Sequence, residues 1–388
     1  MRTRQDIEKL EDKILASYAM KSMQTSGRQY LEPDHETRTC YQRDRDRIIH
    51  CEAFRKLEYK TQVFIIFEGD YYRTRLTHTL EVAQIARTIG RNLLLNEDLI
   101  EAIALAHDLG HPPFGHAGEE ALDEIMKKAN LHGFNHNKRS FEIVTKFEKR
   151  YPYFNGLNLS REVLIGILKH KTTYDIPITT SKEFSERPTL EAQVVDVADS
   201  LAYLNHDIDD GLTSGYITAQ DLMGSTLWQK AYRDIQHIAK SEDKEIFKNQ
   251  IVRSLIDRQV KDLLEVSSKR LKEEKFKNVQ EVKKCKKVII GFSREMASQR
   301  DDLQQMVNKK LYHHYRVERM TSKAKRFIRN LFEAYEKNPR QLPSIIYNPQ
   351  KKYNLENKYD IICNYIASMT DRFALDEHKK LFDPYEKV

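Results

Sequence analysis

Residues 78–109 read HTLEVAQIARTIGRNLLLNEDLIEAIALAHDL, and this stretch predicts two consecutive helices. Its apolar residues recur three or four positions apart, which is typical of helices that bury one face. Gly110 and the pair Pro112-Pro113 end the second helix, because proline cannot continue it. The residues expected to face inward are Leu80, Val82, Ile85, Ala86, Ile89 and Leu93 in the first helix, and Ile100, Ile103, Ala104 and Leu105 in the second.

The rest of the chain also reads mainly as helix. Only 13 glycines and 10 prolines occur in 388 residues, and so few helix breakers favour long helices over many short strands. Residues 58–74, which contain the apolar run Val63–Phe67, predict a connector or short hairpin, and residues 340–352 predict a loop. Further helices are predicted at 41–57, 116–129, 140–148, 160–170, 190–206 and 358–372.

We therefore expect an all-α fold that forms a single unit over residues 1–388. Within it we expect a core at about 41–215 and a peripheral helical region at about 216–345, which is charged and helix-prone. A C-terminal helix at 358–375 is expected to pack back on the core.

The composition excludes several classes of protein. Charged residues make up 32% and hydrophobic residues 40%, which is typical of a soluble globular chain. No run of about 18 apolar residues occurs, so we expect no membrane span, and MRTRQDIEKL lacks the apolar segment of a secretory signal. The four cysteines form no C-x-x-C pair, which argues against disulfides and thiolate zinc and favours the cytoplasm. A net charge of +7 favours an anionic partner.

Four polar side chains interrupt the predicted apolar helices. His78 lies at a helix start, His107 and Asp108 close the next helix, and Asp199 lies inside VVDVADSLAYL. A buried polar group is costly without a partner, and one divalent metal shared by all four would supply it. For any one of these histidines alone, a satisfied core or capping role is the commoner reading. Other carboxylates compete for the role of Asp199, namely Asp196, Asp207, Asp209 and Asp210.

The types of ligand narrow the choice of metal. Two imidazoles and two carboxylates without a thiolate suit a hard or borderline cation that takes six ligands. Four protein ligands leave two positions for water and a substrate oxygen. Manganese, magnesium, iron, nickel and cobalt all fit, whereas tetrahedral structural zinc fits poorly. We expect one such divalent ion.

The same residues form the pattern H-x28-H-D-x90-D, which is that of the HD metallohydrolase superfamily. Seven segments in family order narrow the resemblance, from about Tyr41 to Asp210 and again near 360–375, to the bacterial deoxyguanosinetriphosphate triphosphohydrolase-like proteins. Residues 219–340 match loosely, around LYHHYRVERM. The seven segments are RDRDRII, FRKL, KTQVF, RTRLTHTLEV, AHDLGHPPFGHAGE, ADSLAYLNHDIDDGL and NYIASMTDRFAL.

This resemblance implies an HD-domain helical fold with additional peripheral helices. It implies an enzyme that cleaves deoxynucleoside triphosphates, with dGTP among them, to deoxynucleoside and inorganic triphosphate. The metal ligands it implies are His78, His107, Asp108 and Asp199. It also implies a homo-oligomer, a tetramer or a hexamer, with nucleotide effectors at its interfaces.

The resemblance further assigns roles around the metal. In GHAGE, His116 and Glu119 share a helix face, so the carboxylate can orient the imidazole as general acid or base. A surface salt bridge is the alternative reading of this pair. His111 is implied to contact phosphate and His136 to lie near the triphosphate, although relatives often carry Glu where this chain has Asn135. The other implied substrate contacts are Arg75, Gln62, Tyr203, Asp207 and Tyr312.

The sequence leaves open the roles of two basic stretches. It also leaves open two alternative functions of the whole protein. The lysines of 269–287 predict a solvated surface, with a nucleic-acid patch as the alternative. One other function is a different HD-type enzyme, such as a nucleotide phosphatase or a phosphodiesterase. Another is an inactive HD scaffold that senses nucleotides or binds single-stranded nucleic acid. A solvated helix face is expected for at least half of Arg43, Arg45, Arg47 and Arg55.

Overall fold

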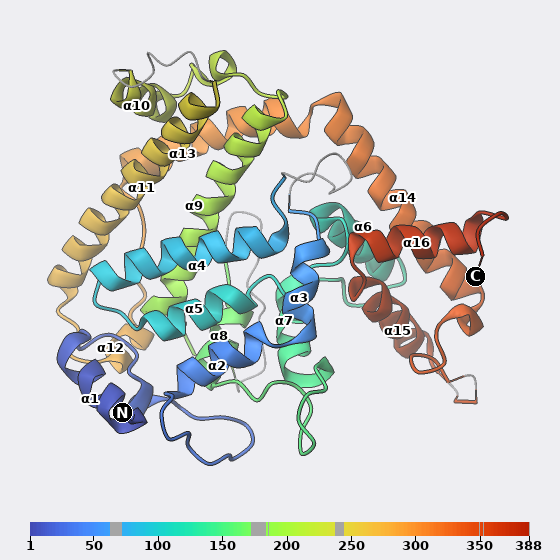
Figure 1. Cartoon of the computed structure of the whole chain (residues 1–388), viewed down its shortest axis with the longest axis horizontal. Helices are drawn as coiled ribbons and strands as arrows, with labels where there is room; N and C mark the ends of the chain where they lie inside the picture. Colours follow the sequence, from blue (N-terminus) through green and yellow to red (C-terminus); the bar gives the residue numbers. More distant parts are fainter. Residues whose placement is uncertain are drawn as a thin grey trace.

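The computed structural model describes residues 1–62, 72–171, 184, 186–236, 244–348, 350–351 and 353–387. Every regular element among these residues is a helix (Figure 1), and β-type pairing among them is limited to two isolated β-bridges. The expected all-α fold class is confirmed. Of the connector predicted at 58–74, residues 63–71 lie outside the described residues, and its first residues belong to a short 3-10 turn, Leu57–Tyr59.

The helices follow one another with short connections. The α-helices are α1 (Arg4–Ile14), α2 (Cys40–Ile49), α3 (Glu52–Lys56), α4 (Arg75–Asn92), α5 (Glu97–Ala106), α6 (Gly115–Lys128), α7 (His136–Glu142), α8 (Arg161–Leu168), α9 (Leu190–Thr213), α10 (Thr226–Ile235), α11 (Lys244–Glu274), α12 (Val279–Lys284), α13 (Arg294–Val307), α14 (Tyr315–Lys337), α15 (Leu355–Ala367) and α16 (Asp371–Phe382). The shorter 3-10 and π turns are η1 (Ser22–Gln24), η2 (Leu57–Tyr59), η4 (Ile143–Phe147), η6 (Ala219–Leu222), η7 (Asn308–Tyr312) and η8 (Pro339–Gln341).

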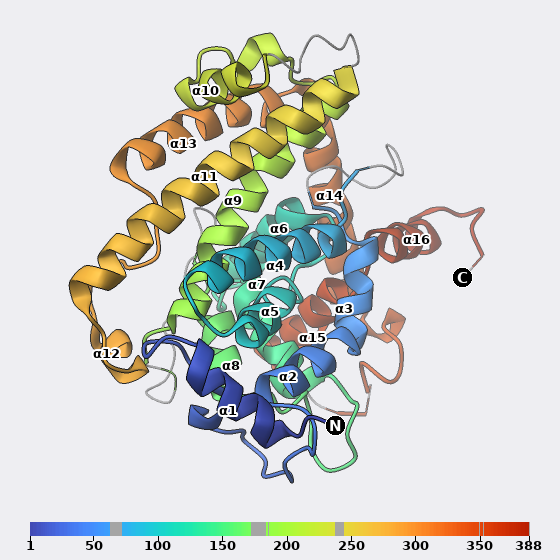
Figure 2. The same cartoon turned by 60° about the vertical axis from the view of Figure 1, so that its left-hand side comes forward.

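The centre of the molecule is built from α4, α5 and α9, which lie against one another in both views (Figures 1 and 2). Each of them begins at a polar residue, Thr74, Asn96 or Thr189, whose side chain accepts hydrogen bonds from backbone N–H groups of the first turn. Seven of the ten residues of α5 are buried, so this helix is enclosed by its neighbours. The same apolar core includes side chains from α2 and α8.

Two further apolar cores flank this centre. One joins α6 to α14, α15 and α16, and the other surrounds Trp228 and joins the second half of α9 to α10, α11 and α13. Leu263 and Leu271 of α11 also reach the central core. Residues beyond 216 therefore pack on the predicted core through apolar side chains, and the division into core and peripheral region stays a prediction.

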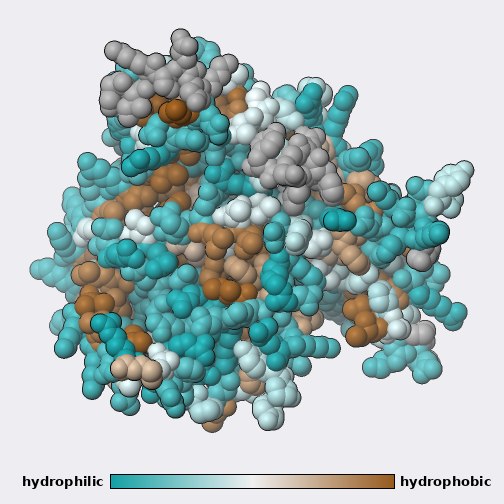
Figure 3. All heavy atoms as spheres, in the orientation of Figure 1, coloured by the Kyte–Doolittle hydropathy of each residue, from teal (hydrophilic) through white to brown (hydrophobic). Residues whose placement is uncertain are grey.

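The surface contrasts with these cores. On the face shown in Figure 3 it is mainly hydrophilic, with small hydrophobic patches. In the described part of the chain, no helix combines the length and the apolar character that crossing a membrane requires.

Two predicted helices are each divided in the structure. The helix predicted at 41–57 is α2 followed by α3, because the Cys51 side chain accepts a hydrogen bond from the Phe54 N–H and starts a new helix. The C-terminal helix predicted at 358–375 is wrong in the same way. There α15 ends at Ala367, and Thr370 caps the new helix α16 by accepting from the Phe373 N–H.

One residue of the deciding stretch faces the other way. Leu80 was expected inside, but it is 50% exposed. It lies two positions before the buried Val82, which places the two side chains roughly on opposite sides of α4. The helical pattern therefore predicted α4 correctly and included one residue too many on its inner face.

The contrast between the buried Ile103 and the half-exposed Leu80 gives a test of the fold. Ile103→Ala should lower the free energy of unfolding by about 2–5 kcal/mol, because the side chain of Ile103, in α5, is fully buried against Gly166 of α8. The matched substitution Leu80→Ala should cost less than about 1 kcal/mol, because half of that side chain is already in water. Urea unfolding measures both, and equal losses would contradict the packing described here.

Candidate metal centre

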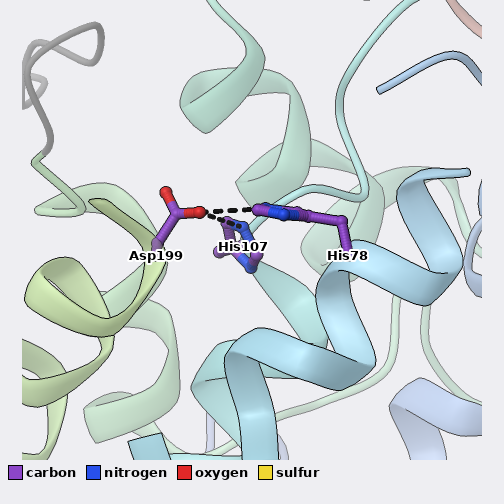
Figure 4. A group of neighbouring side chains, drawn as sticks. All are labelled: His78, His107 and Asp199. Carbon is purple, nitrogen blue, oxygen red and sulfur yellow. Dashed lines mark hydrogen bonds and ion pairs between the residues drawn. The ribbon is translucent and has the colours of Figure 1, made fainter. Parts of the chain in front are cut away.

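The three central helices bring His78, His107 and Asp199 together (Figure 4). His78 lies in the first turn of α4, His107 is the C-cap of α5, and Asp199 lies in the middle of α9. Nε2 of His78 is 2.9 Å from Oδ1 of Asp199, and Nε2 of His107 is 3.8 Å from the same oxygen. All three side chains are buried, and one potential ligand atom of each lies within 4.8 Å of the other two.

The hydrogen bonding of His107 leaves a lone pair for a cation. Its Nδ1 lies 2.6 Å from the carbonyl oxygen of Ala104, so Nδ1 carries the proton and donates it. Nε2 is then the unprotonated nitrogen, and no residue in the described part of the chain hydrogen-bonds to this buried atom. Burial lowers the pKa of His107, against the attraction of Asp108 and Asp199, and a neutral imidazole is the form that binds metals. These residues therefore fit a divalent ion.

Asp108 lies beside this group and is shared with other partners. Its Oδ1 is 3.4 Å from His107 Nε2, and its Oδ2 is 3.9 Å from His78 Nε2. Arg75 donates to Oδ2 at 2.8 Å, and His111 Nε2 lies 3.1 Å from Oδ1. Burial raises the pKa of Asp108, but His107, Arg75 and His111 outweigh it and hold the pKa well below the usual range. The structure thus places a second carboxylate charge next to both histidines.

The aspartates that competed with Asp199 in the sequence point to other partners. Asp196 Oδ1 lies 2.7 Å from a ring nitrogen of a histidine. Asp207 accepts from a tyrosine hydroxyl at 3.0 Å. Asp209 and Asp210 pair with the same arginine at 2.7 and 2.8 Å. Among these five carboxylates, Asp199 is the one that the structure places against His78 and His107.

His206, which the sequence analysis did not single out, orients His78. Nδ1 of His206 lies 3.1 Å from Nδ1 of His78, and its Nε2 lies 2.7 Å from Glu81 Oε2. If His78 presents a lone pair at Nε2, its Nδ1–H must donate to His206, and His206 must donate to Glu81. Burial lowers the pKa of His206 to about 4 despite Glu81, which agrees with the neutral ring that this chain needs. The available signal was its position seven residues after Asp199, on the same helix face.

His170 was also missed, and it holds Asp199 from the opposite side. Its Nε2 lies 3.2 Å from Asp199 Oδ2, and its Nδ1 lies 2.7 Å from Asp196 Oδ1. Burial raises the pKa of Asp199, but His170 and His78 outweigh it and hold the pKa well below the usual range. His170 follows the end of α8, where a single histidine after an apolar helix gives no local signal.

A second polar group surrounds Glu119. Its Oε1 accepts from the backbone N–H of His136 at 2.9 Å and lies 2.9 Å from Nδ1 of the same residue. His116 Nδ1 lies 3.6 Å from Glu119 Oε2, and the rings of His111 and His136 stack with centroids 3.8 Å apart. Burial raises the pKa of Glu119, but His136 and His116 hold it well below the usual range. The pair expected from GHAGE is therefore close, and the two other predicted histidines lie beside it.

A cavity of about 520 Å³ opens next to this group. Tyr203 OH lies 2.5 Å from Tyr312 OH, and Tyr312 donates to Asp207 at 3.0 Å. Asp207 is completely buried behind the tyrosines, and burial raises its pKa well above the usual value. Predicted site residues in the cavity wall are Gln62, His116, Glu119, Tyr203 and Tyr312.

Arg75 lies inside the protein, between these groups. It is 1% exposed, and only its Nη1 is used by Asp108, at 2.8 Å. Among the described residues, its buried Nε and Nη2 have no hydrogen-bond partner. Unpaired guanidinium donors at such a position suit phosphate oxygens, which accept from arginine in pairs.

The predicted basic stretch of α2 and α3 is largely used inside the fold. Arg47 is buried and donates to the Leu157 carbonyl at 2.9 Å, and Arg45 pairs with Asp98 at 3.0 Å. Arg43 donates to a backbone carbonyl, whereas Arg55 is exposed. Arg55 therefore lies on a solvated helix face, whereas Arg47 does not.

Comparison with known families matches this architecture. The HD domain matches residues 75–204, which include His78, His107, Asp108 and Asp199. A phosphohydrolase-associated domain matches residues 290–380. The fold and the grouped histidines and aspartates thus define an HD-domain protein of the phosphohydrolase class.

Three related proteins show which family within this class the chain belongs to. A deoxyguanosinetriphosphate triphosphohydrolase-like protein of Geobacter metallireducens is 49% identical over 376 residues, which cover 96% of each chain. Proteins with the same name from Geobacter sulfurreducens and Bordetella pertussis are 48% identical over 381 residues (98% of each chain) and 44% identical over 375 residues (95% of this chain, 96% of the relative). The chain belongs to this family of deoxyguanosinetriphosphate triphosphohydrolase-like proteins.

The site geometry predicts which carboxylate holds a cation. Asp199→Ala should abolish tight binding of a divalent ion, because it removes the oxygen that faces both histidines. Asp196→Ala should weaken binding by about 10–100-fold, because it acts only through His170. Metal content after gel filtration measures both, with the exposed Asp376→Asn as control. Stoichiometric metal in the Asp199 variant would move the ligand role to Asp196 or Asp207.

Proposed function

We propose that this protein is a metal-dependent hydrolase that converts deoxynucleoside triphosphates, dGTP among them, to deoxynucleoside and inorganic triphosphate. The observation that carries the proposal is the buried group of His78, His107 and Asp199, with Asp108 beside it. The cavity opens at the neighbouring residues His116 and Glu119. We propose these four residues as the ligands of one divalent ion, for which manganese, magnesium, iron, nickel and cobalt are the candidates. When bound, such an ion lowers the pKa of water and polarises a phosphoryl oxygen.

The chain's own residues orient the triphosphate in this proposal. The Nε and Nη2 groups of Arg75, which no described residue pairs with, donate to two phosphate oxygens and thereby fix the α-phosphorus near His107. The stacked rings of His111 and His136 line the path of the remaining phosphates. Water attacks the α-phosphorus, and the bond from this phosphorus to the nucleoside 5′-oxygen breaks.

The departing 5′-oxygen needs a proton, and we assign its delivery to His116. This residue lines the cavity, and the Glu119 carboxylate lies 3.6 Å from its Nδ1 and orients its ring. Glu119 keeps its negative charge in the buried site because histidines surround it. The surface salt bridge considered for this pair does not fit a carboxylate that also binds His136.

The sugar contacts follow from the tyrosine pair. We propose that Tyr203 packs against the deoxyribose and excludes a 2′-hydroxyl by its bulk, and that Gln62 lines the same side. The hydrogen bonds from Tyr203 to Tyr312 and from Tyr312 to Asp207 hold the ring of Tyr203 in place. Asp207 was expected to contact the substrate, and its fully buried position behind Tyr312 favours a supporting role instead.

The names of the relatives support the substrate class, and other properties stay proposals. These are a tetrameric or hexameric assembly, regulation by a nucleotide effector, a cytoplasmic location, and weak binding of single-stranded nucleic acid. Another HD-type phosphatase or phosphodiesterase, or an inactive nucleotide-sensing scaffold, is the competing function.

Product analysis tests the reaction. The purified protein is incubated with each deoxynucleoside triphosphate and its ribonucleotide counterpart, with Mn²⁺ or Mg²⁺, and the products are separated by chromatography. We expect deoxynucleoside and inorganic triphosphate, and slower turnover of ribonucleotides. Orthophosphate or pyrophosphate as the product would favour another phosphohydrolase, and no turnover of any nucleotide would favour the inactive scaffold.

A substitution tests the proton donor. His116→Ala should lower kcat by about 10²–10⁴, the usual contribution of general acid–base catalysis, and should leave the metal content unchanged. The exposed His50→Ala serves as the matched control. Unchanged hydrolysis by the His116 variant at saturating metal would refute its role.

A further inference from the structure

The connection between α5 and α6 has an uncommon backbone directly before His116. Phe114 has a φ of 65° and Gly115 a φ of 57°, and both values lie in the left-handed region that residues with a Cβ rarely adopt. Phe114 occupies the N-cap position of α6, yet its side chain caps no backbone N–H. Something outside this connection must therefore hold it in place.

Asp371, the first residue of α16, supplies one such hold. Its side chain is 1% exposed, and its Oδ1 accepts from the backbone N–H of Phe114 at 2.9 Å. Its Oδ2 accepts from the backbone N–H of Thr61 at 3.0 Å and also from the Thr61 hydroxyl. One carboxylate thus joins the start of α6 to the segment that precedes Gln62 in the cavity wall.

Lys60 holds the other end of the same connection. Its ammonium group is buried and donates to the backbone carbonyl of His111. It also donates to the backbone carbonyl of Ala367, the last residue of α15, at 3.2 Å. The junction between α15 and α16 is therefore hydrogen-bonded directly to Phe114 and, through Lys60, to His111, although it lies about 260 residues away in the chain.

Gly115 is packed closely against the segments that carry Thr61 and Arg75. A Cβ added there would lie 3.3 Å from the Thr61 carbonyl oxygen and 3.3 Å from Arg75 Nη2. A shift of the connection would therefore change the distance between His116, Arg75 and the cavity wall together.

We infer that Asp371 and Lys60 are positioning residues, which hold residues 111–115 so that His116 keeps its place beside the cavity. This inference rests on the proposed role of His116, and it gives the C-terminal helices a part in the reaction besides packing. The position requires a carboxylate, because a single side chain must accept hydrogen bonds from three donors at once.

An isosteric substitution separates this role from packing. Asp371→Asn keeps the size of the side chain, but its amide has one oxygen, and its NH₂ group would face the N–H of Thr61 or of Phe114. We expect kcat to fall at least tenfold, while the affinity for Mg²⁺ stays within twofold, because the proposed ligands lie on α4, α5 and α9. The matched control is Asp376→Asn, an exposed position of the same helix, which should retain the wild-type kcat.

Histidine ring NMR of the Mg²⁺-loaded protein gives a readout that does not need turnover. The Asp371→Asn variant should shift the ring resonances of His111 and His116 and leave those of His35 unchanged. Unshifted rings together with a kcat within twofold of wild type would overturn the inference, as would a parallel loss of Mg²⁺ affinity. If Asp371→Asn does not fold, Thr61→Val, which removes one of the three donors, is measured in the same way and decides by the same outcomes. An inactive wild type would refute the proposed function alone, because the NMR comparison still tests the positioning.

Discussion

The carboxylate of Asp199 is buried in the middle of an apolar helix, and much of the structure serves to give that charge partners. An ionised carboxylate without partners in such a place would be strongly destabilising. His78 and His107 face one of its oxygens and His170 faces the other, so three helices and the segment after a fourth must meet at this point. This meeting point lies where α4, α5 and α9 pack together at the centre of the fold.

The polar side chains of the site lie where helices begin, end or deviate. His78 is in a first turn, His107 is a C-cap, and His116 follows a left-handed residue at the start of α6. Tyr312 closes the π-helical turn η7, a type of deviation that often places functional side chains. At helix ends a polar group can reach its partners without interrupting an apolar stripe, and the long interior of α9 is the exception that needs three histidines.

The C-terminal region contributes more than an additional core. The helices α14, α15 and α16 enclose the apolar face of α6, whose first turns carry His116 and Glu119. Through Asp371 the same region is hydrogen-bonded to the backbone before His116. The match of residues 290–380 to a phosphohydrolase-associated domain thus corresponds to a part of the chain that adjoins the candidate site.

Local pattern alone was enough for several features. The spacing of apolar residues predicted α4, α5 and α9 and the all-α class, because amphipathic periodicity depends only on neighbours along the helix. The group of His78, His107, Asp108 and Asp199 was also visible, because a charged or imidazole side chain within an apolar run is anomalous without reference to any other segment. The breaks at Cys51 and Thr370 were not visible, because a cysteine sulfur as a cap and a short turn within a helical pattern depend on how the flanking helices pack.

Only the tertiary structure decided which partners these residues have. His206 and Glu81, His170 and Asp196, and Asp371 with Thr61 are each separated by between 26 and 310 residues. Their pairing depends on how the three apolar cores orient the helices. Hydrophobic burial sets that orientation through contacts between segments, which the sequence of any one segment does not show. The sequence by itself therefore determined the helices and the unusual polar residues within them, whereas the tyrosine pair, the orientation of His78 and the bond from Asp371 to Phe114 required the packed molecule.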